Sequence, residues 1–209
     1  FLLVLCVLSL GVHSSISGVA FARREGGIGQ DEGQKTVMAP DGSLLVAGVL
    51  GNNATIESQD FTRGIFLAKY NARTGECIWV ISVPVSGNAN VDSLVVDSEG
   101  SAIIGGYALG NVQYSEHDQE TFQNQAIFLA KYDNQGQYLW HAISEAGTTL
   151  GISHLVLSGD DLLVSGFFCG NSTLGTVELV TLDSGCPLFL VKYNASSGEC
   201  LEAKTIGGG

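Results

Sequence analysis

Three segments of this chain are copies of one another, and they restrict its fold more than any other feature of the sequence. Residues 66–79 (FLAKYNARTGECIW) recur at 128–140 (FLAKYDNQGQYLW) and again at 189–201 (FLVKYNASSGECL). The copies begin 128 − 66 = 62 and 189 − 128 = 61 residues apart. Self-similarity at a fixed period of this size indicates a repeat architecture in which each repeat is one supersecondary unit.

Each repeat contains four short apolar runs separated by turn-forming residues, and no window shows a sustained helical period. Four short antiparallel strands per repeat, arranged around an axis, form the blade of a β-propeller. The sequence therefore predicts an all-β chain of three four-stranded blades, with a sandwich or barrel as the alternative. The expected strands are 35–39, 43–50, 64–71 and 76–83 in blade 1, 92–97, 101–108, 126–133 and 137–144 in blade 2, and 152–158, 161–168, 187–194 and 199–206 in blade 3.

The repeated pattern Phe-Leu-Ala-Lys-Tyr-[Asn/Asp], followed by Gly and Trp and preceded by Asp-Gly-x-Leu-Leu-Val-x-Gly, resembles the SBBP-type β-propeller repeat. Residues 26–31 (GGIGQD) are similar to that family's junction between blades. The resemblance covers nearly everything from about residue 18 onward, and it implies a scaffold in secreted and surface proteins without implying a chemistry. Pro40 and Ser158 depart from the family pattern, and the third copy has Leu201-Glu202 in place of its tryptophan.

The expected domain organisation follows from the repeat and from an apolar beginning. Residues 1–10 (FLLVLCVLSL) are uncharged and shorter than the roughly 20 residues of a membrane span, which is typical of a signal-peptide core; a buried strand is the alternative. Three blades do not close a ring, so we expect a fragment of a larger propeller whose last blade pairs with an outer strand near 18–25. The expected segments are a truncated signal peptide at 1–15, an outer strand and junction loop at 16–34, blade 1 at 35–91, blade 2 at 92–151 and blade 3 at 152–209.

Charge and glycosylation sequons indicate an exported protein. Nine Lys and Arg against 21 Asp and Glu give a net charge of −12, which repels phosphate backbones and anionic lipids. We therefore expect neither nucleic-acid binding nor membrane insertion. N-x-[ST] sequons at Asn53, Asn171 and Asn194 predict N-glycosylation of a secreted or cell-surface protein.

The cysteines predict one disulfide. Cys169 ends one expected strand and Cys186 opens the next strand of the same blade. Antiparallel neighbours place these two positions opposite one another, within reach of a disulfide. Cys77 and Cys200 share a repeat position two blades apart and are poorly placed to bond to each other.

The sequence favours packing over catalysis for its most repeated residues. Phe66, Lys69 and Tyr70 recur in every repeat, so we expect them to serve packing between blades, as we do for Trp79 and Trp140. No nucleophile elbow or phosphate-binding loop is present, and we expect neither catalytic residues nor a cofactor.

Two junction loops are rich in oxygen ligands and would be the place for calcium. Asp31 and Asp92 are the candidate ligands there. A complete set of about six to eight oxygens cannot be counted, so solvated loops are the expected interpretation.

The predicted function is a non-catalytic module that binds a protein or glycan. The connections 51–63, 110–125 and 170–186 are long, dissimilar and expected on one face, where variable loops on a rigid scaffold commonly carry recognition. One alternative is a purely structural spacer. Another is the propeller part of an extracellular enzyme, a quinoprotein-like dehydrogenase or lyase with its active centre in missing blades, because residues 71–79 resemble the docking motif of quinone-dependent dehydrogenase propellers. The first-choice contact residues are Tyr114, Glu116, His117 and Asp118.

Overall fold

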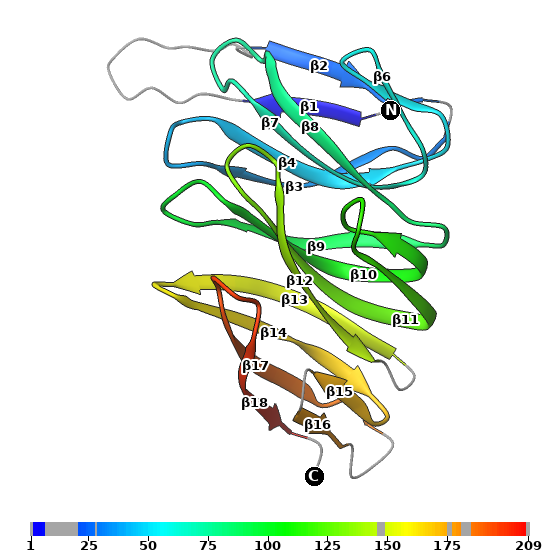
Figure 1. The fold of residues 1–209 in the computed structure, drawn as a ribbon, viewed down its shortest axis with the longest axis vertical. Helices are drawn as coiled ribbons and strands as arrows, with labels where there is room; N and C mark the ends of the chain where they lie inside the picture. The colour runs from blue at the N-terminus through cyan, green and yellow to red at the C-terminus, as the bar shows by residue number, and fades with distance from the viewer. Residues whose placement is uncertain are drawn as a thin grey trace.

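The computed structural model describes residues 2–6, 21–27, 29–145, 149–174, 177–180 and 185–207, and their regular structure is β-strand throughout. Three antiparallel meanders follow one another along the long axis in chain order (Figure 1). Unit 1 consists of β3 (Glu32–Met38), β4 (Leu44–Leu50), β7 (Gly64–Tyr70) and β8 (Cys77–Pro84). Unit 2 consists of β9 (Ala89–Val96), β10 (Ala102–Gln113), β11 (Gln119–Tyr132) and β12 (Tyr138–Glu145). Unit 3 consists of β13 (Thr149–Ser158), β14 (Asp161–Cys169), β17 (Leu188–Asn194) and β18 (Cys200–Ile206).

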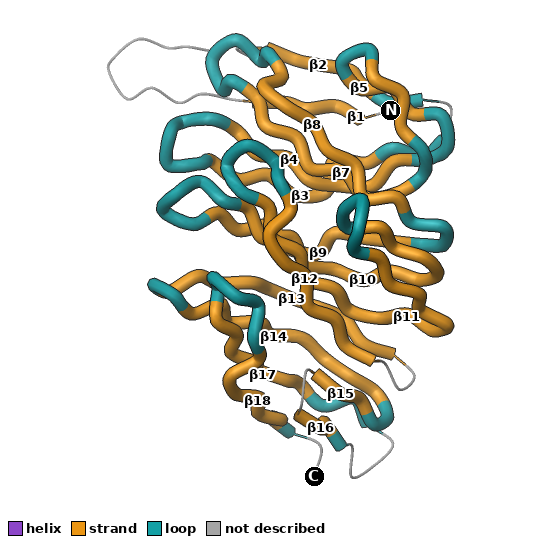
Figure 2. The backbone as a smooth tube through the Cα atoms, viewed as in Figure 1, coloured by secondary structure: helices purple, strands orange, loops and turns teal. Residues whose placement is uncertain are grey.

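The prediction of an all-β chain of antiparallel sheets is confirmed. Units 1 and 3 are four-stranded sheets, whereas the four strands of unit 2 join β15 (Ser172–Leu174) and β16 (Val177–Leu179) in a six-stranded sheet. Figure 2 shows the connections gathered at the two ends of the stacked strands. The described strands form an open stack, in which β9 contacts both β3 and β13, and no closed propeller is detected. The described residues contain no helix long and apolar enough to span a membrane.

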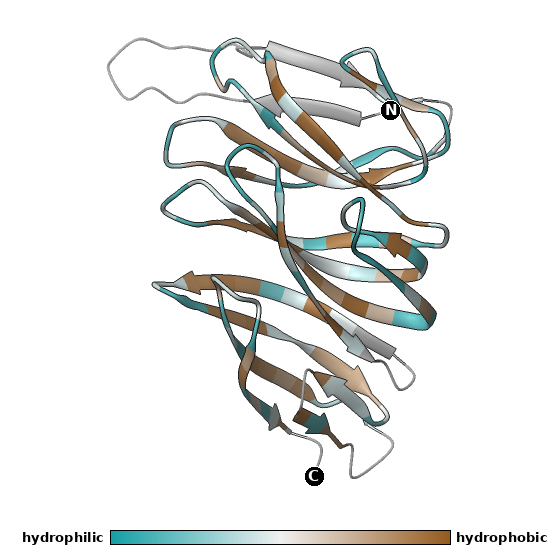
Figure 3. Cartoon of the chain, viewed as in Figure 1, coloured by the Kyte–Doolittle hydropathy of each residue, from teal (hydrophilic) through white to brown (hydrophobic). Residues whose placement is uncertain are grey.

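The hydrophobic core lies between the units because the apolar side chains of one sheet are divided between two clusters, one on each face. Figure 3 shows the apolar residues spread along the strands. One cluster joins unit 1 to unit 2 and includes Leu67 and Phe128, both fully buried. A second joins unit 2 to unit 3 and includes Leu129 and Phe189. A repeat unit that is apolar on both faces cannot bury itself alone, so stacking supplies the missing contacts.

The innermost strand of each unit carries a one-residue β-bulge opposite a repeated glycine. In unit 2 the register shifts between Gly105 and Gly106, which leaves Asp92 as the extra residue. A Cβ on Gly106 would overlap the carbonyl oxygen of Asn90, so only glycine fits. The glycine that ends each upstream block is therefore explained by close approach of the bulged strand.

The expected loop 110–125 is mostly strand, which corrects the sequence prediction. β10 continues to Gln113 and β11 begins at Gln119, so only 114–118 form the turn. The extension folds because Val112 and Phe122 alternate inward and are buried in the core between units 1 and 2. Intervening polar residues hide this alternation in the sequence.

Each connection between the second and third strands reaches back to the outer strand of the preceding unit, and we call it a strap. In unit 3 the strap is the hairpin β15 (Ser172–Leu174) and β16 (Val177–Leu179), and β15 pairs with the end of β12. In unit 2 the extended hairpin forms a bridge from Val112 to Val85, just beyond β8. In unit 1 the strap is β5 (Ala54–Ile56) and β6 (Gln59–Phe61), and Thr55 exchanges backbone hydrogen bonds with Gly26.

The strap of unit 1 lies beside β2 (Phe21–Glu25), the outer strand expected before the first full repeat. β2 pairs in antiparallel fashion with β1 (Leu2–Cys6). Residues 2–6 are thus a strand in this structure, and the signal peptide remains a prediction whose expected cleavage region lies outside the described residues.

At the opposite end, the repeated lysine and tryptophan of one unit hold the turn between the third and fourth strands of the next unit, and we call this arrangement the latch. Trp79 Nε1 donates to the carbonyl oxygen of Asn134 over 3.0 Å, and Lys69 Nζ donates to the side-chain oxygen of the same residue. Trp140 Nε1 and Lys131 Nζ both donate to the carbonyl oxygen of Ala195, over 3.2 and 3.0 Å. The recurring lysine and tryptophan thus contribute to packing between units, as expected.

Candidate ligand-binding cleft

Two neighbouring hollows open between units 1 and 2, at the end of the stack that carries the straps. The larger, which we call the cleft, has a volume of about 490 Å³, and its neighbour has about 460 Å³. The cleft is built from the segment before β3, the end of β4, the start of β7, the junction between β8 and β9, and Tyr107 on β10. Its polar lining includes Gln30, Glu32, Asn52, Arg63, Asn88 and Asn90.

Asp31 fixes the segment before β3 against the end of β4. Asp31 as a whole residue is 3 % exposed, and its carboxylate accepts hydrogen bonds from the backbone N–H of Gly27 over 2.6 Å and of Gly51 over 2.9 Å. Both carboxylate oxygens therefore serve backbone amides. This gives Asp31 a structural role at the edge of the cleft.

Gln34 joins the two units beneath the cleft. Its Nε2 donates to Asn90 Oδ1, and its Oε1 accepts from the backbone N–H of Val91 over 2.7 Å. Asn90 in turn donates from Nδ2 to Asp92 over 2.5 Å, while burial raises the pKa of Asp92. These contacts fix the innermost strands of units 1 and 2 in one register.

Arg63 lies between the two hollows and lines both of them. Asn52 also lines both. Arg63 Nη2 donates to Asn88 Oδ1 over 2.6 Å, and its carbonyl oxygen accepts from Val85 N over 3.1 Å. Because Asn88 lies in the junction that leads to unit 2, this pair joins units 1 and 2 across their boundary.

The lining chemistry suits an uncharged polar ligand. Carboxamides predominate, with a single carboxylate at Glu32 and a single guanidinium at Arg63. A carboxamide both donates and accepts hydrogen bonds, so a row of them matches the paired donors and acceptors of adjacent hydroxyl groups. Five carboxamides line the cleft, those of Gln30, Gln34, Asn52, Asn88 and Asn90. Gln34 and Asn90 are engaged with one another, with Val91 and with Asp92, so the groups assigned to a ligand are Gln30, Asn52 and the Nδ2 of Asn88.

The predicted contact residues lie at the tip of the unit 2 strap and are not all accessible. Tyr114 is 3 % exposed and stacks on the ring of His141, with ring centroids 4.3 Å apart, so its side chain belongs to the core. Burial also raises the pKa of Tyr114. Asp118 is partly buried and accepts from Ser115 Oγ over 2.9 Å. Only Glu116 and His117 are exposed.

The two calcium candidates form no metal centre with other side chains. Within the part of the chain that the structure describes, no three His, Cys, Asp or Glu side chains come together as a group suited to a metal ion. Asp31 serves backbone amides, and Asp92 accepts from Asn90.

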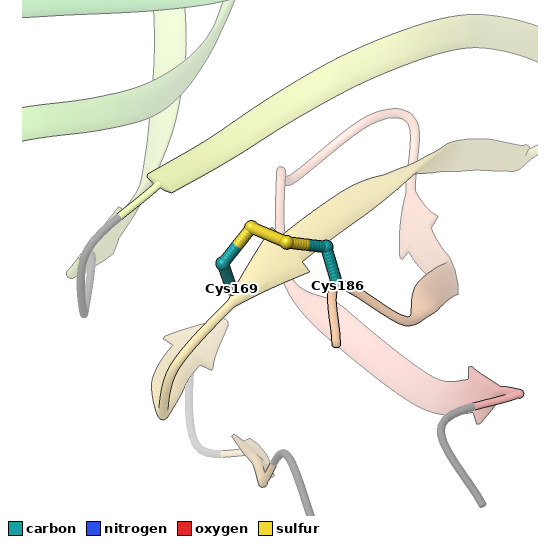
Figure 4. The surroundings of a disulfide bond; sticks show 2 residues. All are labelled: Cys169 and Cys186. Atoms are coloured by element: carbon teal, nitrogen blue, oxygen red, sulfur yellow. A yellow bond between two sulfur atoms is a disulfide. The ribbon is translucent and has the colours of Figure 1, made fainter. Parts of the chain in front are cut away.

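The predicted disulfide between Cys169 and Cys186 is confirmed, with Cα atoms 4.4 Å apart (Figure 4). It closes the base of the unit 3 strap. Cys77 and Cys200 are thiols at equivalent positions on β8 and β18, and burial raises the pKa of Cys200.

The three sequons lie in different surroundings. Asn53 and Asn171 are exposed in the straps, next to the cleft end of the stack. Asn194 lies at the opposite end and is partly buried. Its side-chain oxygen accepts from the backbone N–H of Ser196 over 2.9 Å and of Ser197 over 3.0 Å, so it shapes the turn.

Sequence reasoning missed Arg63, Asn52 and Asn88 as lining residues. A signal for two of them was present: Asn52 belongs to the Gly-Asn pair that follows the second strand of each repeat, and Asn88 precedes the acidic junction. Arg63 carries no local signal, because its role depends on the neighbouring unit. The chain matches no protein-family model. A search of the curated proteins finds no match either.

Proposed function

We propose that this chain is three consecutive β-propeller blades of the SBBP type in an extracellular or cell-surface binding module. The module is non-catalytic and binds an uncharged, hydroxyl-rich glycan in the cleft between units 1 and 2. The observation that carries this proposal is the carboxamide lining of the cleft around Arg63. A volume of about 490 Å³ falls within the range of roughly 300–1,000 Å³ that is usual for small-ligand sites.

The repeated geometry supports the assignment to propeller blades. Each unit is a four-stranded meander, and the innermost strands β3, β9 and β13 contact one another in chain order. Straps at one end and latches at the other repeat from unit to unit. Such repetition of the same contacts from sheet to sheet is typical of radial repeat folds.

The disulfide and the exposed sequons support an extracellular location. Disulfides persist in oxidising compartments and are rare in the cytosol. The bond between Cys169 and Cys186 joins two strand ends of one unit, as structural disulfides do. Asn53 and Asn171 are exposed, which N-glycosylation requires.

The charge of the chain favours a neutral ligand over an acidic one. A net charge of −12 repels anionic ligands at a distance, and the cleft adds only one guanidinium to oppose it. A neutral glycan avoids this repulsion and uses the carboxamides directly.

The test is binding of the full chain to an array of neutral oligosaccharides, compared with two variants. Asn88→Ala removes a lining carboxamide and the acceptor of Arg63, and we expect it to weaken binding by about tenfold, the effect of roughly 1.4 kcal/mol. Gln135→Ala alters an exposed carboxamide in the turn at the opposite end and should leave binding unchanged. Absence of any glycan bound by the wild type, or equal affinity of the two variants, would contradict the proposal.

A further inference from the structure

The hollow beside the cleft, which we call the side hollow, lies between the strap of unit 2 and the end of the outer strand of unit 1. Its lining comes from the segment before β7, from the end of β8 with the junction that follows, and from the paired strands β10 and β11 of the strap. Its volume of about 460 Å³ is that of a small-ligand site in its own right. The lining residues that bear on a ligand, besides the shared Asn52 and Arg63, are Pro84, Val85, Ser86, Val112, Gln113 and Gln119.

The base of the side hollow is the bridge that joins the two units. Val85 pairs with Val112 in antiparallel fashion, and the two residues are 2 % and 0 % exposed. Beside this bridge, Ser86 N donates to the carbonyl oxygen of Asn111 over 2.9 Å, and Asn111 N donates to Ser86 Oγ over 2.8 Å. Because these backbone groups are already paired, the base offers an apolar surface of fixed shape, which suits the C–H face of a sugar ring.

Two glutamines at the rim of the side hollow have free carboxamides. Gln113 and Gln119 lie opposite one another on β10 and β11, and both are exposed. Among the described residues, neither carboxamide has a hydrogen-bond partner. A carboxamide both donates and accepts, so this pair can bind the hydroxyl groups of a sugar that rests on the apolar base.

Arg63 and Asn52 make the side hollow continuous with the cleft, since they line both and are exposed. The guanidinium of Arg63 is held by its hydrogen bond to Asn88 Oδ1 over 2.6 Å. That bond uses one N–H donor, and the remaining donors of the guanidinium have no partner among the described residues. They are left for a ligand at the place where the two hollows meet.

We propose that the cleft and the side hollow are the two halves of one binding site for a linear, uncharged oligosaccharide. This inference rests on the proposed function and adds that the ligand is an unbranched chain long enough to occupy both hollows, crossing the unit boundary at Arg63. The cleft binds one end of the chain through its free carboxamides. The side hollow binds the other end through Gln113 and Gln119 above the valine bridge.

The charge of the side hollow agrees with a neutral chain. Among the residues that line it, Arg63 is the one charged side chain, and the net charge of −12 on the whole protein repels an acidic ligand. Glu116 and His117, at the tip of the strap, line neither hollow. A chain that follows the two hollows therefore passes below the tip and meets no carboxylate in the side hollow.

The test measures affinity against ligand length by calorimetric titration of the full chain. The probes are linear oligomers of glucose, of mannose and of N-acetylglucosamine, each from the disaccharide to the hexasaccharide. In a series that binds, we expect affinity to rise at least about tenfold with length, because only the longer members reach the side hollow.

A double variant and a matched control assign this rise to the side hollow. Gln113→Ala/Gln119→Ala removes both free carboxamides of the rim and should abolish the rise with length. Both residues are exposed, so the substitutions leave the buried core untouched. Gln123→Ala alters an exposed carboxamide on β11 that lines neither hollow, and it should keep the wild-type rise.

Affinity that does not depend on length, while Asn88→Ala still weakens binding, would overturn the continuous site and leave the proposed function in place. An equal rise in the wild type and in the double variant would also overturn it, because the gain would then arise outside the side hollow. Failure of every series to bind would contradict the inference as well. The effect of Asn88→Ala on the glycan array decides the proposed function separately.

Discussion

Trp140 on β12 donates a hydrogen bond from Nε1 to the carbonyl oxygen of Ala195, in the turn between β17 and β18 of the next unit, over 3.2 Å. Trp79 stands in the same relationship to Asn134, one unit earlier, over 3.0 Å. Donor and acceptor both lie in repeated segments of the sequence. The repeated residues themselves therefore determine how one unit aligns with the next.

Removal of the Trp140 indole N–H should remove one hydrogen bond of the latch and leave its ring packing in place. Trp140→Phe keeps an aromatic ring and should lower the free energy of unfolding by about 1 kcal/mol, the net value of one hydrogen bond. Trp140→Ala also leaves a cavity and should cost about 3–5 kcal/mol. Denaturant unfolding of the full chain measures both. The neighbouring Leu139, 48 % exposed, is the control, since Leu139→Ala should change stability by no more than about 0.5 kcal/mol. A Trp140→Ala effect as small as that of Leu139→Ala would contradict the latch.

The glycine that receives the tryptophan ring allows a matched comparison. Gly198 has φ of +74°, and a Cβ there would lie 2.6 Å from Cε3 of Trp140. Gly159 has φ of +61° and has no atom within 4 Å of such a Cβ. Gly159→Ala should cost only the backbone penalty of roughly 1–2 kcal/mol, whereas Gly198→Ala adds overpacking worth roughly 1–3 kcal/mol. Thermal and denaturant unfolding measure whether Gly198→Ala loses more stability than Gly159→Ala. Equal losses of stability in the two variants would mean that the Trp140 ring does not pack on the turn.

The parts of the fold that the sequence predicts are those determined by local pattern. The turns after Met38 and Val96 and the disulfide between Cys169 and Cys186 follow from glycine, proline and cysteine positions, and the structure places them as expected. The straps were missed because pairing of Val112 with Val85 depends on how two units meet. Tyr114 is expected at the tip of a binding loop because residues 113–120 (QYSEHDQE) are the most polar of the long connections and carry an aromatic residue, yet its ring is buried in the core.

Stability should fall in acid because two aspartates are paired with the latch lysines. The hydrogen bond from Lys69 holds the pKa of Asp41 below its usual range. Burial alone would raise the pKa of Asp97, but hydrogen bonds from Lys131 and the Ser101 backbone outweigh it and lower the pKa overall. A folded-state pKa below the unfolded value near 4 gives stability that is present above about pH 4 and lost as pH falls through the folded pKa.

The free energy of unfolding should therefore decrease between about pH 5 and about pH 2, and Asp97→Asn should reduce this decrease. Asparagine keeps an oxygen for the backbone N–H of Ser101, so the variant isolates the charge. Unfolding curves recorded across this pH range give the slope of the free energy of unfolding against pH. An Asp97→Asn slope identical to that of the wild type would show that the pair with Lys131 does not carry the effect.

Loss of the disulfide should destabilise unit 3 and release its strap. The bond closes a span of 17 residues, for which chain entropy predicts about 3 kcal/mol. The double variant Cys169→Ser/Cys186→Ser should lose about that much and should exchange backbone hydrogens faster where β15 pairs with β12. Non-reducing peptide mapping of the wild-type protein gives the direct check, and alkylation of Cys169 as a free thiol would refute the bond.

The cleft lay beyond sequence prediction for a physical reason. Its lining comes from five segments, including Tyr107 on β10, that are brought together only when unit 2 packs on unit 1. Arg63 meets Asn88 across 25 positions of the chain, and Gln34 meets Asn90 across 56. Individually these residues resemble ordinary polar residues of a loop. Composition and spacing therefore favour Glu116 and His117, in the most polar connection, as contact residues.

The most direct measurement of the central claim is a titration of isotope-labelled full chain with a neutral oligosaccharide bound on the array, followed by nuclear magnetic resonance. Ligand in the cleft should shift the side-chain amide signals of Asn52 and Asn88 and the guanidinium signal of Arg63, and leave the tip of the unit 2 strap unaffected. Shifts confined to Glu116 and His117, or no shifts at saturating glycan, would contradict a glycan site between units 1 and 2.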